Sequence, residues 1–91
     1  MISQTVNISN KLGLHARAAS VFVKLACSFS SDIQVTRADK KANGKSIMAL
    51  MMLEAAKGND LILSIDGPDE KAAMSGLIML IEDRLGESEC H

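Results

Sequence analysis

The spacing of apolar residues switches several times between a period of two and a period of about 3.6, and this order restricts the fold more than any other feature of the chain. Alternation of apolar and polar residues predicts strands over residues 2–8, 33–36, 40–42 and 61–65. Helical spacing and helix-start residues predict helices over residues 16–29, 47–56 and 68–84. The predicted element order is therefore βαββαβα.

Four residues mark the ends of these elements. Gly44 ends the third strand, and Ser46 is suited to the N-cap of the second helix because its hydroxyl can accept a hydrogen bond from a first-turn amide. Gly58 is predicted to be the left-handed residue that stops this helix. Pro68 is predicted to lie just inside the start of the last helix.

A chain of 91 residues is the usual length of one compact domain, which we predict over residues 1–85, with a frayed tail over 86–91. Short strands separated by hairpins or single helices favour an antiparallel sheet with helices on one face, an α+β fold. The pattern alone is equally compatible with a ferredoxin-like split βαβ arrangement.

The charge balance and the composition exclude several classes of partner. Ten basic and eleven acidic residues give a formal net charge of −1, which argues against nucleic acid or anionic lipid as the main partner. Aromatic residues are limited to Phe22 and Phe29, so stacking platforms for single-stranded nucleic acid are absent from the sequence. The longest apolar run, residues 47–53, is far shorter than the roughly 20 residues that span a bilayer, so membrane insertion is not expected.

The cysteines indicate a reducing compartment. Cys27 and Cys90 are far apart, and neither has a Cys or His close in sequence that would suggest a zinc site. No basic stretch followed by an apolar core is present at the N-terminus, so no secretory signal is visible. We therefore expect a cytoplasmic protein with reduced thiols, no metal and no cofactor.

The most unusual chemical feature is the stretch GLHAR at residues 13–17, where the first strand gives way to the first helix. His15 is predicted at or beside the N-cap, where unpaired backbone amides and the helix dipole favour an anion. Arg17 adds a forked donor that matches a phosphate, and Gly13 allows a tight turn. These residues predict an anion site that contains a titratable nucleophile, although a surface or capping histidine is the commoner role.

The second helix is too apolar for a small domain to bury completely. Three of the six methionines lie in residues 47–53, and a helix that is apolar all round is normally covered on all sides. We predict that Ile47, Leu50 and either Leu53 or Ala55 turn inward, and that Met48 and either Met51 or Met52 are exposed. The residues alone do not separate a docking surface from a core helix with tolerated exposure.

Residues 10–19, NKLGLHARAA, resemble the active-site signature of the histidine-containing phosphocarrier (HPr) family of the bacterial phosphoenolpyruvate-dependent phosphotransferase system. The similarity continues through GKSIM at residues 44–48, through residues 53–58, and through GPDE at residues 67–70. It covers nearly the whole chain in the family's order of elements. The family fold is a two-layer open-faced sandwich, with a four-stranded antiparallel sheet in the order 1-4-2-3 and three helices on one face.

The resemblance implies a role for each element of the site. His15 would accept a phosphoryl group through Nδ1, and Arg17 would be its electrostatic partner. Enzyme I would be the donor, and the Enzyme II A components of the sugar-uptake branch, or their counterparts in a nitrogen-related branch, would be the acceptors. The second helix would dock Enzyme I through Ile47, Met48 and Met51, flanked by Lys24 and Lys45. We expect a monomer with transient interfaces.

Two further positions gain meaning from the resemblance. Ser46 corresponds to the serine that a dedicated HPr kinase/phosphorylase modifies in part of the family, which implies regulatory phosphorylation. Ala18 stands where the family usually has proline, and alanine leaves a backbone donor and a freer first turn. A metal-carrying ferredoxin-like domain and a regulatory or structural domain without phosphoryl chemistry are the alternative functions.

Overall fold

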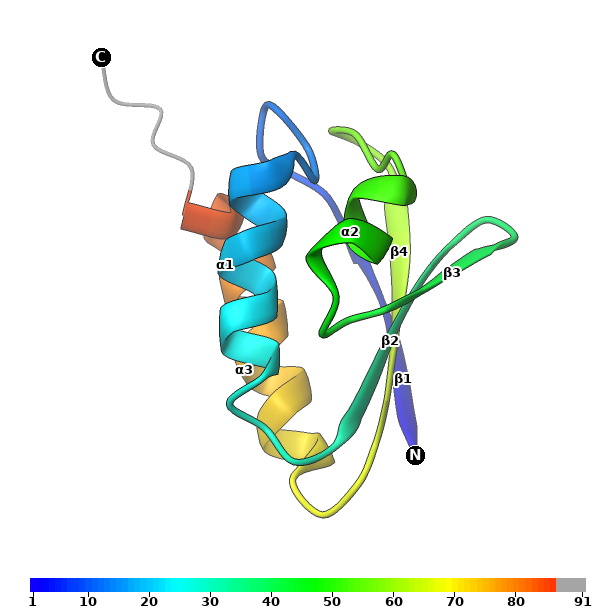
Figure 1. Cartoon of the computed structure of the whole chain (residues 1–91), viewed down its shortest axis with the longest axis vertical. Helices are drawn as coiled ribbons and strands as arrows, with labels where there is room; N and C mark the ends of the chain where they lie inside the picture. The colour runs from blue at the N-terminus through cyan, green and yellow to red at the C-terminus, as the bar shows by residue number, and fades with distance from the viewer. Residues whose placement is uncertain (87–91) are drawn as a thin grey trace.

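The computed structural model describes residues 1–86 and places a four-stranded sheet on one side and the helices on the other (Figure 1). The elements follow the predicted βαββαβα order, and a short 3₁₀ turn is added at the end. They are β1 (Ile2–Asn7), α1 (Ala16–Ala26), β2 (Asp32–Arg37), β3 (Lys40–Asn43), α2 (Ile47–Met52), β4 (Asp60–Asp66), α3 (Glu70–Glu82) and η1 (Arg84–Gly86). Of the predicted tail, only Gly86 belongs to the described residues.

The sheet has the order β1-β4-β2-β3, and every neighbouring pair is antiparallel. β4 lies in the centre, where Ile65 pairs with Ile2 of β1 and with Ile33 of β2. The predicted order 1-4-2-3 is confirmed. The ferredoxin-like alternative is wrong, because it requires β1 and β3 to be parallel neighbours, whereas here they form the two edges of the sheet.

One face of the sheet and the inner faces of the helices form the core. Strand alternation sends Val35, Leu63 and Ile65 to this face, where each is completely buried. The helices add fully buried Leu50 and Leu77 to the same cluster. Each such side chain contributes on the order of 1.5–3 kcal/mol by leaving water, so this alternation holds the two layers together.

Two helices end earlier than predicted because local hydrogen bonds replace the helical ones. α1 ends at Ala26, not near residue 29, because the Ser28 amide and hydroxyl both donate to Leu25 O at 3.0 and 2.6 Å. α2 ends at Met52, not near residue 56, because Glu54 adopts a left-handed conformation with φ of 54°. Gly58 is left-handed as predicted, but it lies in the following loop and does not stop the helix.

The start of α3 also differs from the prediction, since Pro68 precedes the N-cap residue Asp69 instead of lying inside the helix. The Asp69 carboxylate does not cap its own helix. It accepts hydrogen bonds from the amides of Ser30 and Ser31 and from the Ser31 hydroxyl, and so ties the α1–β2 loop to α3. These donors, with the Ser31 hydroxyl first, hold the pKa of Asp69 below its ordinary value.

The structure of residues 1–86 contains no helix that is both long enough and apolar enough to cross a membrane. The longest, α3, has 13 residues.

Replacing Asp69 with asparagine is expected to lower the melting temperature at pH 7. The three donors bind both carboxylate oxygens, whereas asparagine is uncharged and has only one acceptor oxygen, so at least one donor loses its partner. The folded-state pKa of Asp69 is depressed, so its contribution is complete above the unfolded-state pKa and is lost as pH falls through the folded-state value. Melting curves between pH 7 and pH 2 should therefore converge for Asp69→Asn and wild type. Asp39→Asn, at an exposed turn carboxylate, is the charge control, and a constant Asp69→Asn difference at all pH values would contradict the assignment.

Candidate functional site

The candidate site lies at one end of the molecule, where the β1–α1 connection and the α2–β4 connection approach each other at the start of α1 (top of Figure 1). The β1–α1 connection carries the predicted GLHAR stretch, and the first two residues of α1 complete it. The sequence prediction that this stretch joins the first strand to the first helix is confirmed.

His15 is the N-cap residue of α1, as predicted, with an extended backbone at φ −79° and ψ 176°. Its carbonyl accepts the first helical hydrogen bond, from Ala19 N at 2.8 Å, so the three preceding amides have no partner within the helix. The imidazole makes no capping hydrogen bond to these amides, and the first turn contains no acidic side chain. The side chain is half-buried, because the turn packs against the core.

Arg17 lies in the same first turn and is exposed. The site therefore combines a nitrogen nucleophile, the amide end of an 11-residue helix and one guanidinium. Both the amides and the guanidinium favour an anion beside the imidazole. Ala18, where the family usually has proline, is buried in the core, and the helix still begins at Ala16.

The turn before His15 is fixed by contact with the α2–β4 connection. Gly13 has φ of 68°, and a Cβ placed there would lie 2.4 Å from the Ala55 carbonyl oxygen. Leu14 donates its amide to the same oxygen at 2.9 Å. The Asn10 side chain donates to Gly13 O at 2.7 Å and closes the turn from within. Glycine is therefore required at position 13 both for its backbone conformation and for the close approach.

Sequence reasoning missed the α2–β4 connection as part of the site. Residues 53–58 resemble the family, but no local pattern indicates that Ala55 accepts a hydrogen bond from a residue 41 positions earlier. The one local signal was Gly58, which marks a loop and says nothing about what that loop contacts.

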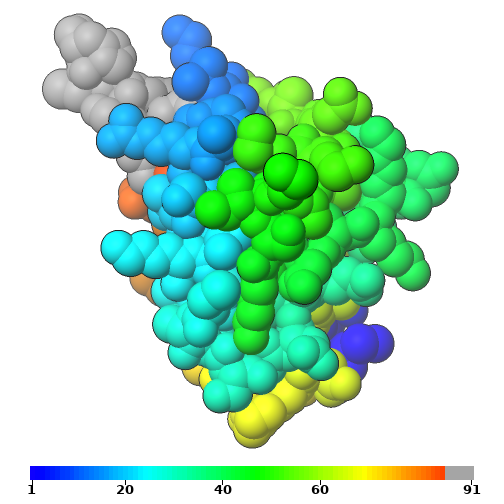
Figure 2. All heavy atoms as spheres, viewed as in Figure 1, coloured from blue at the N-terminus to red at the C-terminus, as the bar shows by residue number. Residues whose placement is uncertain are grey.

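The exposed side of α2 is apolar and lies beside α1 on the same face of the molecule (Figure 2). We call it the methionine surface; its members and exposed fractions are Ile47 41%, Met48 74%, Met51 42% and Met52 69%. Leu50 turns inward as predicted, whereas Ile47 does not, because a six-residue helix packs only one narrow face on the sheet. Met48, Met51 and Met52 also line a depression with Lys40 and Glu54.

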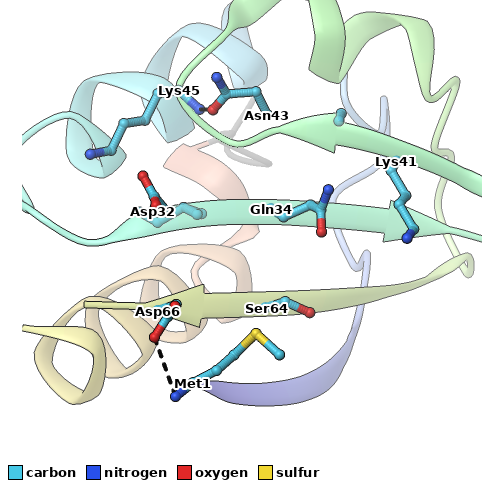
Figure 3. A pocket seen from close by; sticks show the side chains of 10 residues that line it. Met1, Asp32, Gln34, Lys41, Asn43, Lys45, Ser64 and Asp66 are labelled. Carbon is cyan, nitrogen blue, oxygen red and sulfur yellow. Dashed lines mark hydrogen bonds and ion pairs between the residues drawn. The ribbon is translucent and has the colours of Figure 1, made fainter.

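The predicted flanking lysines occupy different surroundings. Lys24 is exposed in the last turn of α1, away from the amide end of the helix that carries His15. Lys45 is half-buried and donates from Nζ to the Phe29 carbonyl at 2.8 Å, which ties its charge to the α1–β2 loop. It also lines a depression formed mainly by β2, β3 and β4 with the N-terminus (Figure 3). Lys45 is therefore not brought together with His15 and Arg17.

Ser46 caps α2, as predicted, because its hydroxyl accepts a hydrogen bond from Ala49 N at 3.2 Å. The side chain is half-buried and immediately precedes the methionine surface. Among residues 1–86, no group of three or more His, Cys, Asp or Glu side chains is arranged to hold a metal ion.

Comparison with known proteins agrees with this geometry. A family model named PTS-HPr and described as the "PTS HPr component phosphorylation site" matches residues 2–83. The phosphocarrier protein HPr of Neisseria meningitidis serogroup A is 52% identical over 89 residues, covering 98% of this chain and 100% of that protein.

Two solved HPr structures from Thermoanaerobacter tengcongensis are similar to this chain at 48% identity. One has a TM-score of 0.92 and covers 97% of this chain and 99% of its own. The other, described as an HPr dimer, has a TM-score of 0.76 and covers 96% and 100%. The family match, the level of identity and the shared fold together show that the chain belongs to the HPr family of phosphocarrier proteins of the phosphotransferase system.

Proposed function

We propose that this chain carries a phosphoryl group on His15, which it accepts from phosphorylated Enzyme I and passes to Enzyme II A components. The observation that carries the proposal is the position of His15 at the N-cap of α1, with Arg17 in the first turn and no acidic residue in that turn. Family membership supports the carrier role, and the geometry supports these two residues as its reacting centre.

The reaction follows from the arrangement of these groups. The Nδ1 lone pair of neutral His15 attacks the phosphorus atom, an N–P bond forms, and the bond from phosphorus to the donor breaks. The transferred group carries its negative charge into the space in front of the first-turn amides, beside the Arg17 guanidinium. Delivery reverses the step toward the next carrier. Phosphoryl transfer depends mainly on positioning and charge stabilisation, so the chain can supply half of the site and the partner the rest.

The methionine surface is the proposed docking site for Enzyme I. It is exposed and apolar, and it lies beside the helix that begins at His15. Flexible methionine side chains suit a surface that meets several partners in turn. Arg17 and Lys24 contribute positive charge along α1, which would steer acidic partners. Lys45 instead donates a hydrogen bond to the Phe29 carbonyl in the neighbouring α1–β2 loop.

Ser46 is the proposed regulatory position, where an HPr kinase/phosphorylase would add a phosphoryl group. Its hydroxyl is half-buried and adjoins Ile47 and Met48, both exposed. A phosphate would place about −1.5 to −2 charges at the edge of an apolar docking surface, where desolvating it on binding is costly. The modification would therefore oppose docking more than it opposes folding.

The proposal also covers the number of domains, the cellular location, the oligomeric state and the pathway branch. Residues 1–85 form one domain, supported by a single buried cluster that runs from Val6 to Leu85. We propose a cytoplasmic monomer, because a carrier that passes its phosphoryl group from one partner to the next requires transient interfaces. The sugar-uptake and nitrogen-related branches are alternatives, which transfer assays with A components from each branch distinguish.

The central test uses His15→Ala. Wild type incubated with phosphoenolpyruvate and Enzyme I should gain one acid-labile phosphoryl group by intact mass, and the variant should gain none. His15 lies at a helix end and outside the buried core cluster, so its truncation should lower the free energy of unfolding by about 1 kcal/mol or less. Normal phosphorylation of a folded His15→Ala protein would overturn the assignment, and an unmodified wild type would favour a regulatory domain without phosphoryl chemistry.

Docking is tested with Met48→Glu and a matched control on another helix. Met48 is 74% exposed on α2, and Met79 is 67% exposed on α3, so the two substitutions introduce the same charge at similarly exposed methionines. Met48→Glu should weaken Enzyme I binding by roughly tenfold, the effect of losing about 1.4 kcal/mol at an interface, without altering the melting temperature. Met79→Glu should bind normally. Equal binding by both variants, measured by calorimetry, would show that the methionine surface does not dock Enzyme I.

The Ser46 proposal is tested with an aspartate and an alanine at the same position. Aspartate is a good N-cap residue, so Ser46→Asp should keep or raise the melting temperature while slowing phosphorylation of His15 by Enzyme I. Ser46→Ala removes the bond to Ala49 N, so it should cost about 1 kcal/mol of stability and leave the phosphorylation rate unchanged. If Ser46→Asp accepts phosphoryl groups at the wild-type rate, Ser46 is a cap only.

A further inference from the structure

Arg37 is a half-buried arginine at the end of β2 that no motif in the sequence singles out. Its Nη1 donates to the Leu53 carbonyl at 3.1 Å, and its Nε donates to Asn59 Oδ1 at 3.1 Å. Leu53 is the C-cap residue of α2 and is fully buried, and its carbonyl is one of those that a helix end leaves without a helical partner. One guanidinium therefore contacts both ends of the segment of residues 53–59. This segment is the α2–β4 connection described above, and we call it the α2–β4 loop.

Asn59 extends this network within the loop. Its Oδ1 also accepts a hydrogen bond from Ala56 N at 2.8 Å, so one amide oxygen joins Arg37 to the middle of the loop. The Asn59 carbonyl accepts from Ile8 N at 2.9 Å, and the Ile8 carbonyl accepts from Gly58 N at 2.8 Å. The loop is thus fixed on one side by Arg37 and on the other by the end of β1.

The loop needs such support because its backbone is not in a favoured conformation. Glu54 is a non-glycine residue with φ of 54°, a left-handed conformation that costs an L-residue energy unless its surroundings hold it. The next residue, Ala55, provides the carbonyl that receives Leu14 N and against which Gly13 packs. A shift of the loop would therefore move the two residues that precede His15.

We propose that Arg37 is a positioning residue for phosphoryl transfer, which fixes the α2–β4 loop through Leu53 and Asn59 and thereby sets the orientation of His15. This inference rests on the proposed function of His15. An arginine suits the role because its planar fork presents separate N–H donors to two acceptors, whereas lysine presents a point charge on a flexible stem. Small displacements matter here, since about 1 Å of misplacement can lower a transfer rate by roughly 100-fold.

The first experiment compares Arg37→Ala with Lys41→Ala, which removes the same charge from an exposed side chain on β3. Phosphorylation by Enzyme I is measured as kcat and KM for this chain as substrate. The methionine surface is intact in both variants, so Arg37→Ala should lower kcat by about tenfold and change KM by less than twofold. Lys41→Ala should match wild type in both values.

The same variants are followed by NMR, which reads the position of the turn without any phosphoryl transfer. In Arg37→Ala the Leu14 amide should exchange with solvent at least about tenfold faster than in wild type, because its acceptor is no longer held, and the His15 ring signals should shift. The Leu63 amide, in the centre of β4, is the control. After correction for any change in the global free energy of unfolding, its exchange rate should equal that of wild type.

A pair of substitutions at Asn59 tests the network independently, and decides the matter if Arg37→Ala does not fold. Asn59→Asp keeps an oxygen at the position that accepts from Arg37 and Ala56, so it should retain wild-type kcat and Leu14 exchange. Asn59→Ala removes the acceptor and should reproduce the Arg37→Ala effects, and the double variant Arg37→Ala/Asn59→Ala should be no slower than either single one.

Two results would overturn the proposal. One is a wild-type kcat and Leu14 exchange rate in a folded Arg37→Ala or Asn59→Ala protein. The other is a change in KM alone, which would make Arg37 part of the docking surface. Failure of the proposed function gives a different result from failure of the Arg37 proposal. If the proposed function is wrong, wild type is not phosphorylated on His15. Leu14 exchange and the His15 ring signals would still report whether Arg37 positions the turn.

Discussion

The contact between the backbone of residues 13–14 and the Ala55 carbonyl joins two loops that are distant in sequence and sets the geometry at the start of α1. It fits only because Gly13 has no side chain, and it holds only because the loop that contains Ala55 is tied to both β1 and β2. The sheet order makes this possible, since the central strand β4 follows that loop and brings its start beside the end of β1. The site is therefore a product of the topology and not of the GLHAR stretch alone.

The molecule separates the groups that hold the fold from those that face outward. Leu63 and Ile65 are fully buried under the helices, whereas Arg17 and Met48 project from the first turn of α1 and from α2. Under the proposed function, this separation lets partners approach the reacting nitrogen without disturbing the core. His15 lies between the two groups, half-buried, because the turn that carries it also packs Leu14 into the core.

Sequence reasoning succeeded where one local cause decides the outcome. Strand alternation, the Ser46 cap and the His15 helix start each depend on neighbouring residues, and the structure confirms them. Two helix ends were wrong because local features that apolar spacing does not reveal decide them: Ser28 donates to the Leu25 carbonyl after α1, and Glu54 adopts a left-handed conformation after α2. The strand order likewise came from family resemblance, because apolar spacing does not specify which strands are neighbours.

Alanine at position 18, where the resemblance to the family leads us to expect proline, is compatible with a helix that begins at Ala16. Proline would restrict φ in the first turn and remove one amide donor there. Here the helix begins at Ala16 with His15 in an extended conformation, so this start does not require proline. Two other contacts fix the path into the helix: Leu14 N to Ala55 O, and burial of Ala18 in the core. The bond from Leu14 N to Ala55 O restricts the turn without any proline, and the Ala18 amide lies at the amide end of α1, where, under the proposed function, it would add a donor for a phosphoryl group on His15.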